Sequence, residues 1–528
     1  MKRLAIVCAS TLLIAGDAWA QGEMDAYRYS QTEVTGTARS MSMGGAFGAL
    51  GGDISSIAIN PAGMAVFRKS EVATTLSLSG IKTNSNLNGN KMSEDKVKFN
   101  FDNIGYVGYF PTANDHGLIN WNVGFTYNRV KNFERKYRAG GNGMKTSLSD
   151  YIAFKADGIK QNDLAETETY LPYDNPNLGG SWLPILGYDA YIIEGNSDSP
   201  DERFYSGIFP QDVLPNSSLF IQERGGIDEY DFAFSGNISN FLSVGASFSI
   251  YDLDYKMSSK YDEKFPTLGN KTGMYLDNEL HTEGTGYGFK IGAIVNPVEF
   301  FRVGVAYHSP VWYNMTDRYI GYAGVIDVPG FSKNYDSATP DGAYTDYNLR
   351  TPDKWVFSAA AIFGKSALLS VDYEISDYSK MNLQAPNGLE YGDNEFIKQD
   401  FKTARTLRIG AEVKVTPQFA VRAGGAFRNS PMKTQLKEGS IEVLTAGTVP
   451  NYTVDKGMSM YTFGFGYRFT PSFYVDAACV LKQHKEDVHF FSNYSWENSD
   501  GTTGEAITPA ASMKTKTTNV LLTFGYKF

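Results

Sequence analysis

The chain has 528 residues, of which 42% are hydrophobic, 14% aromatic and 20% charged, and its formal net charge is −10. This acidity argues against general nucleic-acid binding, and two cysteines with five histidines exclude a disulfide scaffold or a Cys/His-rich metal protein. The abundance of aromatic residues and of glycine, 53 in all, favours an all-β protein.

Residues 1–20 have the organisation of an export signal. Lys2 and Arg3 precede the apolar stretch 4–15, and Ala-Trp-Ala at 18–20 ends the segment with small residues at its outer positions. This order is typical of a secretory signal peptide, and we expect cleavage before Gln21.

Residues 21–69 are rich in small residues. The stretch 37–53 reads TARSMSMGGAFGALGGD, and an Asn-Pro turn follows it. Glycine at this density permits close backbone approach, while the Met, Phe, Leu and Ile side chains of the segment need burial. We expect a compact plug inside a larger structure, and a glycine-rich linker is the alternative. The candidate plug residues are Gly44, Gly45, Asn60, Pro61, Ala62 and Gly63.

From about residue 70 onward, apolar residues alternate with polar or small ones. In 241–254 the even positions from 242 to 250 are Leu, Val, Ala, Phe and Ile, and the odd positions between them are Ser and Gly. The stretches 461–469 and 519–528 follow the same period of two. Such alternation indicates β-strands between two unlike environments. These are the two faces of a soluble sandwich, or the lipid and the water on the two sides of a membrane barrel.

The lengths of the connections decide between these two architectures. About fourteen strands are expected, at 70–83, 98–110, 117–133, 219–236, 241–258, 278–296, 298–315, 353–364, 366–378, 402–415, 418–433, 456–469, 471–486 and 512–528. Short connections such as 364–365 alternate with long ones, of which 134–218 is the longest. Outer-membrane barrels have short periplasmic turns and long external loops. We therefore predict a transmembrane antiparallel β-barrel over 70–528, with every long loop outside the cell.

The stretch 39–64, centred on Asn-Pro-Ala-Gly-Met at 60–64, resembles the N-terminal hatch of the FadL/TodX family of outer-membrane transporters for hydrophobic compounds. Two later hairpins, 287–310 and 407–431, are similar to hairpins of that family: the first ends in R-x-G-x-x-Y-x-S-P at 302–310, and the second ends in R-x-G-x-x-F-x-x-S-P at 422–431. The resemblance covers most of 37–528. It implies a fourteen-stranded barrel with a hatch in its lumen, a location in the outer membrane of a Gram-negative type of cell, and transport of long-chain fatty acids or related compounds.

The resemblance also implies a route for the ligand. External loops capture it, the hatch closes an internal pocket, and the ligand leaves sideways through a defect in the third strand. On this chain that strand is 118–133, and Gly124 is the candidate weak point; the alternative is a glycine that only fills the barrel interior. The hatch residues at 60–63 would move during transport, and the alternative is a static plug.

Basic residues on the inward face offer contacts for a carboxylate head group, or else they pair with acidic residues across the lumen. The basic candidates are Arg302, Arg408, Arg422 and Arg468. Their candidate acidic partners are Asp372, Glu374, Glu412 and Asp476.

Catalytic and metal-binding patterns find little support. The chain has no Gly-x-Ser-x-Gly or His-Glu-x-x-His motif. His484 and His489, five residues apart, are a weak pattern for haem or metal ligation. We expect no enzymatic activity, no cofactor and no metal.

The sequence thus predicts an outer-membrane channel for hydrophobic compounds. The alternatives are a passive porin for polar solutes and a structural or adhesive surface barrel that acts through its long loops. The expected partners are a fatty-acid-like ligand, outer-membrane lipid and the outer-membrane assembly machinery. The last of these is expected because Phe528 ends an alternating aromatic strand.

Overall fold

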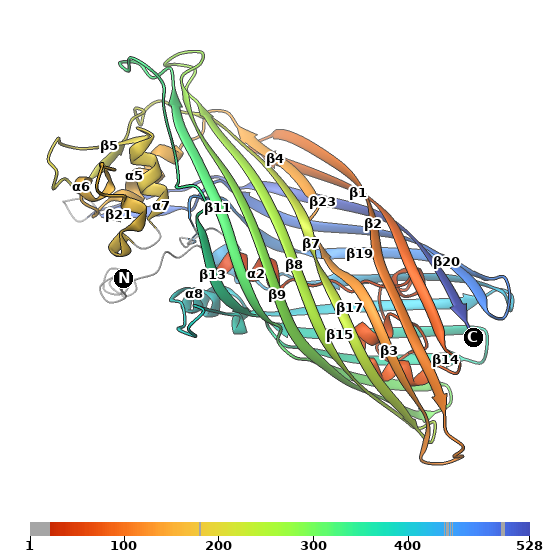
Figure 1. The fold of residues 1–528 in the computed structure, drawn as a ribbon. Coiled ribbons are helices and arrows are strands. Elements are labelled where there is room, and N and C mark those ends of the chain that lie inside the picture. The colour runs from red at the N-terminus through yellow and green to blue at the C-terminus, as the bar shows by residue number, and fades with distance from the viewer. Residues whose placement is uncertain are drawn as a thin grey trace.

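The computed structural model describes residues 22–178, 181–437, 447–497 and 502–528, together with residues 439, 443 and 445. The predicted signal peptide lies outside these residues. The described chain forms a closed antiparallel barrel of 14 strands, in which the last strand pairs with the first (Figure 1). The predicted fold class is confirmed. The wall strands are β1 Glu71–Leu87, β2 Asn90–Pro111, β3 Leu118–Asn132, β7 Asn216–Ile238, β8 Leu242–Lys264, β9 Gly273–Val298, β10 Phe301–His308, β14 Lys354–Phe363, β15 Ala367–Asp377, β17 Thr403–Lys414, β18 Phe419–Arg428, β19 Tyr452–Arg468, β20 Phe473–His489 and β23 Ala511–Lys527.

The alternation in the sequence separates the two faces of this wall. Leu78 of β1 lies opposite Val520 of β23, and the two side chains point outward with 51% and 53% of their surface exposed. Thr75 and Thr523, also opposite each other, are fully buried and hydrogen-bonded inside the barrel. Closure of the ladder pairs the backbone groups that lipid could not satisfy.

The two ends of the barrel differ. One end carries the long connections and is called here the loop end. The other carries the short turns and is called the turn end, where the C-terminus lies (Figure 1). Several wall strands are extended or joined at the loop end by β4 Arg135–Gly141, β11 Trp312–Ile326, β12 Tyr335–Ala338, β13 Tyr344–Arg350 and β16 Asn382–Gln384.

The N-terminal segment lies inside the barrel. Its elements are α2 Glu23–Ser30, α3 Ala38–Ser42, α4 Ser56–Ile59 and the 3-10 helix η1 Pro61–Val66. Ala38 N donates a hydrogen bond to Thr523 Oγ1 of β23 (2.7 Å), while Gly48 N donates to Asp372 Oδ2 of β15 (2.9 Å). The segment therefore contacts well-separated parts of the wall. We call residues 22–70 the plug.

The long connection at 134–218 folds into a cap at the loop end (Figure 1). It contains α5 Leu148–Ala156, α6 Gln161–Leu164, η2 Pro172–Asp174, η3 Pro176–Leu178, α7 Trp182–Asp189, β5 Ile193–Gly195 and β6 Tyr205–Gly207. The other elements at this end are η4 Tyr378–Lys380, α8 Asp393–Asp400, α9 Thr434–Lys437, β21 Tyr494–Glu497 and β22 Thr503–Ala506.

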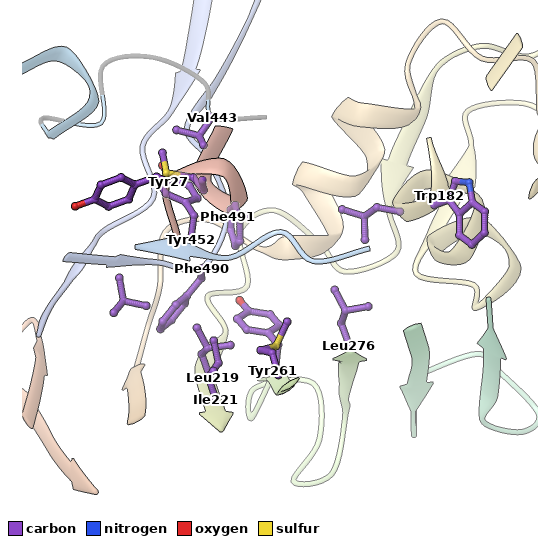
Figure 2. Packing of buried hydrophobic residues seen from close by; sticks show 14 of the residues in the cluster. Tyr27, Trp182, Leu219, Ile221, Tyr261, Leu276, Val443, Tyr452, Phe490 and Phe491 are labelled. Carbon is purple, nitrogen blue, oxygen red and sulfur yellow. The ribbon is translucent and has the colours of Figure 1, made fainter. Parts of the chain in front are cut away.

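The cap is held on the barrel by a continuous buried core. Tyr261 of β8 meets Phe490 with ring centroids 5.7 Å apart, and Phe491 stacks at 5.3 Å on Tyr151 of the cap helix α5. Figure 2 shows Tyr261 and Phe490 side by side, with Leu219 and Ile221 of β7 next to them. Among the described residues, no helix has the length and apolar character needed to cross a membrane.

Candidate functional site

The Asn-Pro turn anchors the plug near the turn end. Asn60 caps η1, because its Oδ1 accepts a hydrogen bond from Ala62 N (3.1 Å) and its Nδ2 donates to Gly48 O (2.7 Å). Pro61 takes the first helical position, where no N–H is needed. A Cβ added to Gly245 of β8 would lie 2.4 Å from the carbonyl carbon of Pro61. Plug and wall therefore meet backbone to backbone, and movement of these residues stays a prediction.

The glycines predicted to belong to the plug are required by its shape. Gly44 and Gly45 have φ of +67° and +73°, in the left-handed region that favours glycine. A Cβ on Gly44 would lie 2.7 Å from the backbone N of Gly425 in β18. Gly63 accepts a hydrogen bond from Gly52 N (3.0 Å), which closes the plug on itself.

Two of the predicted lumen arginines meet different surroundings. Arg302 Nη1 donates to Leu50 O of the plug (2.6 Å), so this side chain fixes the plug and is not free for a ligand. Arg468 is exposed and lines a polar cavity that also includes Arg39 of the plug. Asp372, predicted to pair with an arginine, instead receives the plug backbone at Gly48 N.

The other two arginines pair with acidic residues. Arg408 Nη2 donates to Glu374 Oε2 at 2.7 Å. Arg422 bridges Glu412 (2.7 Å) and Asp476 (2.6 Å), and all three side chains are buried. These contacts agree with the second of the two predicted roles, pairing with acidic residues across the lumen. Both guanidinium groups are bonded to carboxylates.

An ion-pair latch, not predicted from the sequence, joins the plug to the wall in the middle of the lumen. Glu33 of the plug accepts a hydrogen bond from Lys482 of β20 (2.5 Å) and lies 3.7 Å from Lys131 of β3. Its backbone N also donates to Val130 O of β3 (2.8 Å). Burial alone would raise the pKa of the Glu33 carboxyl, but the two lysines hold that pKa well below its usual range. The carboxylate therefore stays ionised.

The wall of the barrel is incomplete beside this latch. The β2–β3 ladder runs from Pro111↔Asn120 to Asn103↔Asn128 and ends there, although β2 continues to pair with β1 up to the loop end. On its other side, β3 pairs with β7 through a bulge between Arg129 and Lys131. An unpaired strand edge at membrane depth is unusual, since lipid offers no hydrogen-bond partner.

Side chains take the place of the missing ladder. Asn132 Nδ2 donates to Asn100 Oδ1 (3.2 Å), and Lys98 Nζ donates to Glu134 Oε1 (2.8 Å). On the outer face, Phe99 of β2 is 63% exposed. We call this region, between residues 97–102 of β2 and 129–134 of the third wall strand, the gap. It is closed by polar side chains and bordered on the outside by apolar ones.

The structure places Gly124 below the gap, in the intact part of the wall. It lies opposite Val107 of β2 and Ala233 of β7, and both ladders are continuous at this position. A Cβ at Gly124 would lie 2.4 Å from Met64 Sδ and 2.8 Å from Ile57 Cδ1, both in the plug. Glycine is needed here for close approach of the plug, and a role in exit stays a prediction.

A cavity connects the plug, the latch and the gap. Its lining includes Glu33 and Lys482 from the latch and Asn100, Asn132 and Glu134 from the gap. Neither feature has a local sequence signal, because each depends on contacts between residues far apart in the chain.

The two histidines considered as ligands belong to β20, opposite β19, and they make different contacts. His484 Nε2 is 3.0 Å from Asp455 Oδ2, which also accepts from Tyr27 of the plug (2.6 Å). His489 stacks on Tyr452 with ring centroids 4.7 Å apart. In the part of the chain that the structure describes, no group of three His, Cys, Asp or Glu residues is arranged to hold a metal ion.

Comparisons with known proteins agree with this architecture. The 47 kDa outer membrane protein of Pasteurella multocida is 23% identical over 216 residues, which are 40% of this chain and 46% of that protein. Outer membrane protein P1 of Haemophilus influenzae is 24% identical over 208 residues, 39% of each chain. The matched region thus spans less than half the length of either relative.

A solved structure shows the same fold. The crystal structure of a Pseudomonas aeruginosa FadL homologue superimposes with a TM-score of 0.52 at 16% identity, covering 94% of this chain and 99% of that one. The family model of outer membrane protein transport proteins (OMPP1/FadL/TodX) matches residues 231–528, more than half of the chain. The predicted family and outer-membrane location are therefore confirmed: the chain belongs to the OMPP1/FadL/TodX family of outer-membrane transport proteins.

Proposed function

We propose that this protein carries hydrophobic compounds, such as long-chain fatty acids, across the outer membrane. The observation that carries the proposal is the gap, which faces lipid while the plug occupies the lumen. An exit into lipid serves a solute that prefers lipid to water, since each buried CH₂ contributes about 0.8 kcal/mol. A polar solute would gain nothing from it.

The route proposed here leads from the loop end through the cavity beside the plug. This cavity combines charged groups with apolar side chains that suit an alkyl chain, among them Met24, Ile81, Val130, Phe133 and Leu521. From the cavity the ligand leaves through the gap. This places the exit beside Asn132, closer to the loop end than Gly124.

The gate in this proposal is the plug segment 31–35. It stands behind the gap, because Glu33 N is bonded to Val130 O at the bulge of β3. Detaching Glu33 from Lys482 would remove one of the wall contacts of this segment, which Lys131 and Lys354 also hold at Gln31 and Thr32. Asn60, whose Nδ2 donates to Ala293 O of β9 (3.4 Å), keeps the plug seated at the turn end. The closed state is then the one described here.

Uptake experiments test the function directly. Cells that lack their own route for long-chain fatty acids are supplied with this protein, and uptake of labelled oleate is measured beside permeation of a small sugar. Oleate uptake without sugar permeation is expected. Sugar permeation alone would identify a polar porin, and neither activity would favour a structural or adhesive barrel; both results contradict the proposal.

A further inference from the structure

Four lysines gather on the outer face of three neighbouring wall strands. Lys82 of β1 lies directly opposite Lys516 of β23, and Lys514 of β23 lies directly opposite Lys485 of β20. All four side chains are exposed. They share the outward face with Leu78, Val520 and Leu481, because residues two apart in a strand point the same way. We call Lys82, Lys485, Lys514 and Lys516 the lysine patch.

The lysine patch lies where the apolar belt of the barrel ends. Below it the outward residues are apolar or small: Leu78 and Gly80 on β1, and Val520 and Thr518 on β23. A Cβ on Gly80 would have only the Thr518 carbonyl oxygen nearby, at 3.9 Å, so the wall beneath the lysines is open to an acyl chain. The lysines therefore stand at the level of lipid head groups, on the loop-end side of the membrane.

Within the part of the chain that the structure describes, the charges of the patch lack carboxylate partners. Among the described residues, no ion pair within 4 Å joins any of its four ammonium groups to a carboxylate, although Asp95 of β2 lies opposite Lys82. The nearby Asp487 is already paired with Lys456. Like charges directly opposite each other destabilise an antiparallel pair. An anion bound from outside the chain would reduce this repulsion between the opposed lysines.

The opposite part of the wall shows a different arrangement of charge. There Lys256 pairs with Asp254, Lys260 with Asp277 and Arg318 with Glu283. These outward cations are neutralised within the protein, and they supply a matched control for the patch.

We infer that the lysine patch binds the phosphorylated head group of a lipid in the outward-facing leaflet, whose acyl chains lie along Gly80, Thr518 and Val520. Four ammonium groups on adjacent strands suit a phosphate group, and the apolar surface beneath them suits the lipid chains. A head group there would offset the repulsion between the opposed lysines. This site lies on the outer wall and does not depend on the transport proposal.

The test uses the purified full chain in detergent micelles and two probes, bisphosphorylated lipid A and the same lipid A with its phosphates removed. Binding is measured by native mass spectrometry. In the variant K82Q/K514Q/K516Q, affinity for the phosphorylated probe should fall roughly 100-fold, since each lysine beside an anionic lipid contributes about fivefold. Affinity for the dephosphorylated probe should not change. The control K256Q/K260Q/R318Q removes the same charge and should bind both probes like the wild type.

Several results would overturn the inference: unchanged binding in the patch variant, an equal loss in the control, or equal affinity of the wild type for the two probes. Displacement of the lipid by an equal concentration of inorganic phosphate would assign the lysines to a free anion and would also overturn it. The wild type gives a test that needs no variant. Raising the ionic strength from about 0.1 M to about 1 M shortens the screening length from roughly 10 Å to roughly 3 Å and should weaken binding of the phosphorylated probe only.

Discussion

Replacing Glu33 with glutamine tests whether the latch holds the plug segment 31–35 closed. The change keeps the shape of the side chain and removes its charge, so that the ion pair with Lys482 is lost and Lys131 loses a neighbouring carboxylate. The side chains of Glu33 and Lys482 are 33% and 22% exposed, between a surface pair and a buried one. Surface pairs contribute up to about 1 kcal/mol, and breaking a buried pair costs about 3–5 kcal/mol. We therefore expect opening of the segment to become about 2 kcal/mol easier, a rise of roughly 30-fold in its open population.

The Glu33 amide hydrogen reports this opening, because it is bonded to Val130 O at 2.8 Å in the closed state. Hydrogen exchange is followed by mass spectrometry on the purified protein, with attention to peptides that contain residue 33. Under conditions where closing is faster than exchange, the exchange rate scales with the open population. The rate in E33Q should rise roughly 30-fold, while peptides from the wall strands should exchange as before.

Glu374→Gln is the matched control. It also removes a lumen carboxylate that is bonded to a cation. However, Glu374 and its partner Arg408 both belong to wall strands, so this ion pair does not join the plug to the wall. An unchanged rate at residue 33 in E33Q, or an equal rise in E374Q, would refute the idea that the latch holds the segment.

Three further predictions concern the plug and the loop end. Gly44→Ala should destabilise the plug by about 2 kcal/mol, because alanine is unfavourable at this φ and its Cβ would contact Gly425. The protease sensitivity of the plug should therefore rise. Gly89→Ala, at φ +90° with open space around it, should leave the protease sensitivity of the plug unchanged. Deleting residues 22–66 should open the lumen, and single-channel recordings should then show a conductance that the intact protein lacks. Burial raises the pKa of Asp393 in α8 to about 7, so the folded helix favours the protonated carboxyl. The stability of α8 should therefore fall as the pH rises from the pKa of an aspartate in the unfolded chain to about 7. After correction for intrinsic rates, exchange in α8 should be faster at pH 8 than at pH 5, and D393N should remove this difference.

The barrel was predictable because lipid acts on every strand in the same way. Each wall strand must show apolar residues on one face only, so the period of two marks the strands, as at Leu78 and Val520. The alternation of long and short connections then fixed the direction of the strands. The predicted 70–83 became Glu71–Leu87, and the predicted 241–258 became Leu242–Lys264, with the extra residues at the loop end. There the strands extend beyond the apolar belt, where alternation is weaker.

The site was less predictable, because its parts are contacts between distant segments. Glu33 and Lys482 are separated by 449 positions, and neither residue stands out locally. The gap depends on where β2 stops pairing with β3, at Asn103 and Asn128, which is a property of two strands together. The inward-facing arginines could be identified from the sequence. Whether they bind a ligand or a carboxylate of the protein depends on the strand register, which places Arg422 opposite Glu412.

The position of the exit can be tested by closing the gap with a reversible bond. Asn100 and Asn132 touch across the gap, with Nδ2 of Asn132 3.2 Å from Oδ1 of Asn100. The variant N100C/N132C in a Cys479→Ser background therefore places one thiol on each side of the gap, and mass spectrometry establishes that the disulfide has formed. If the ligand leaves through the gap, oxidation should reduce oleate uptake to the level of cells without the protein, and reduction should restore it. The oxidised and reduced forms come from the same cells expressing one variant, so differences in expression cannot produce the difference in uptake. Full uptake by the oxidised protein would contradict exit at the gap.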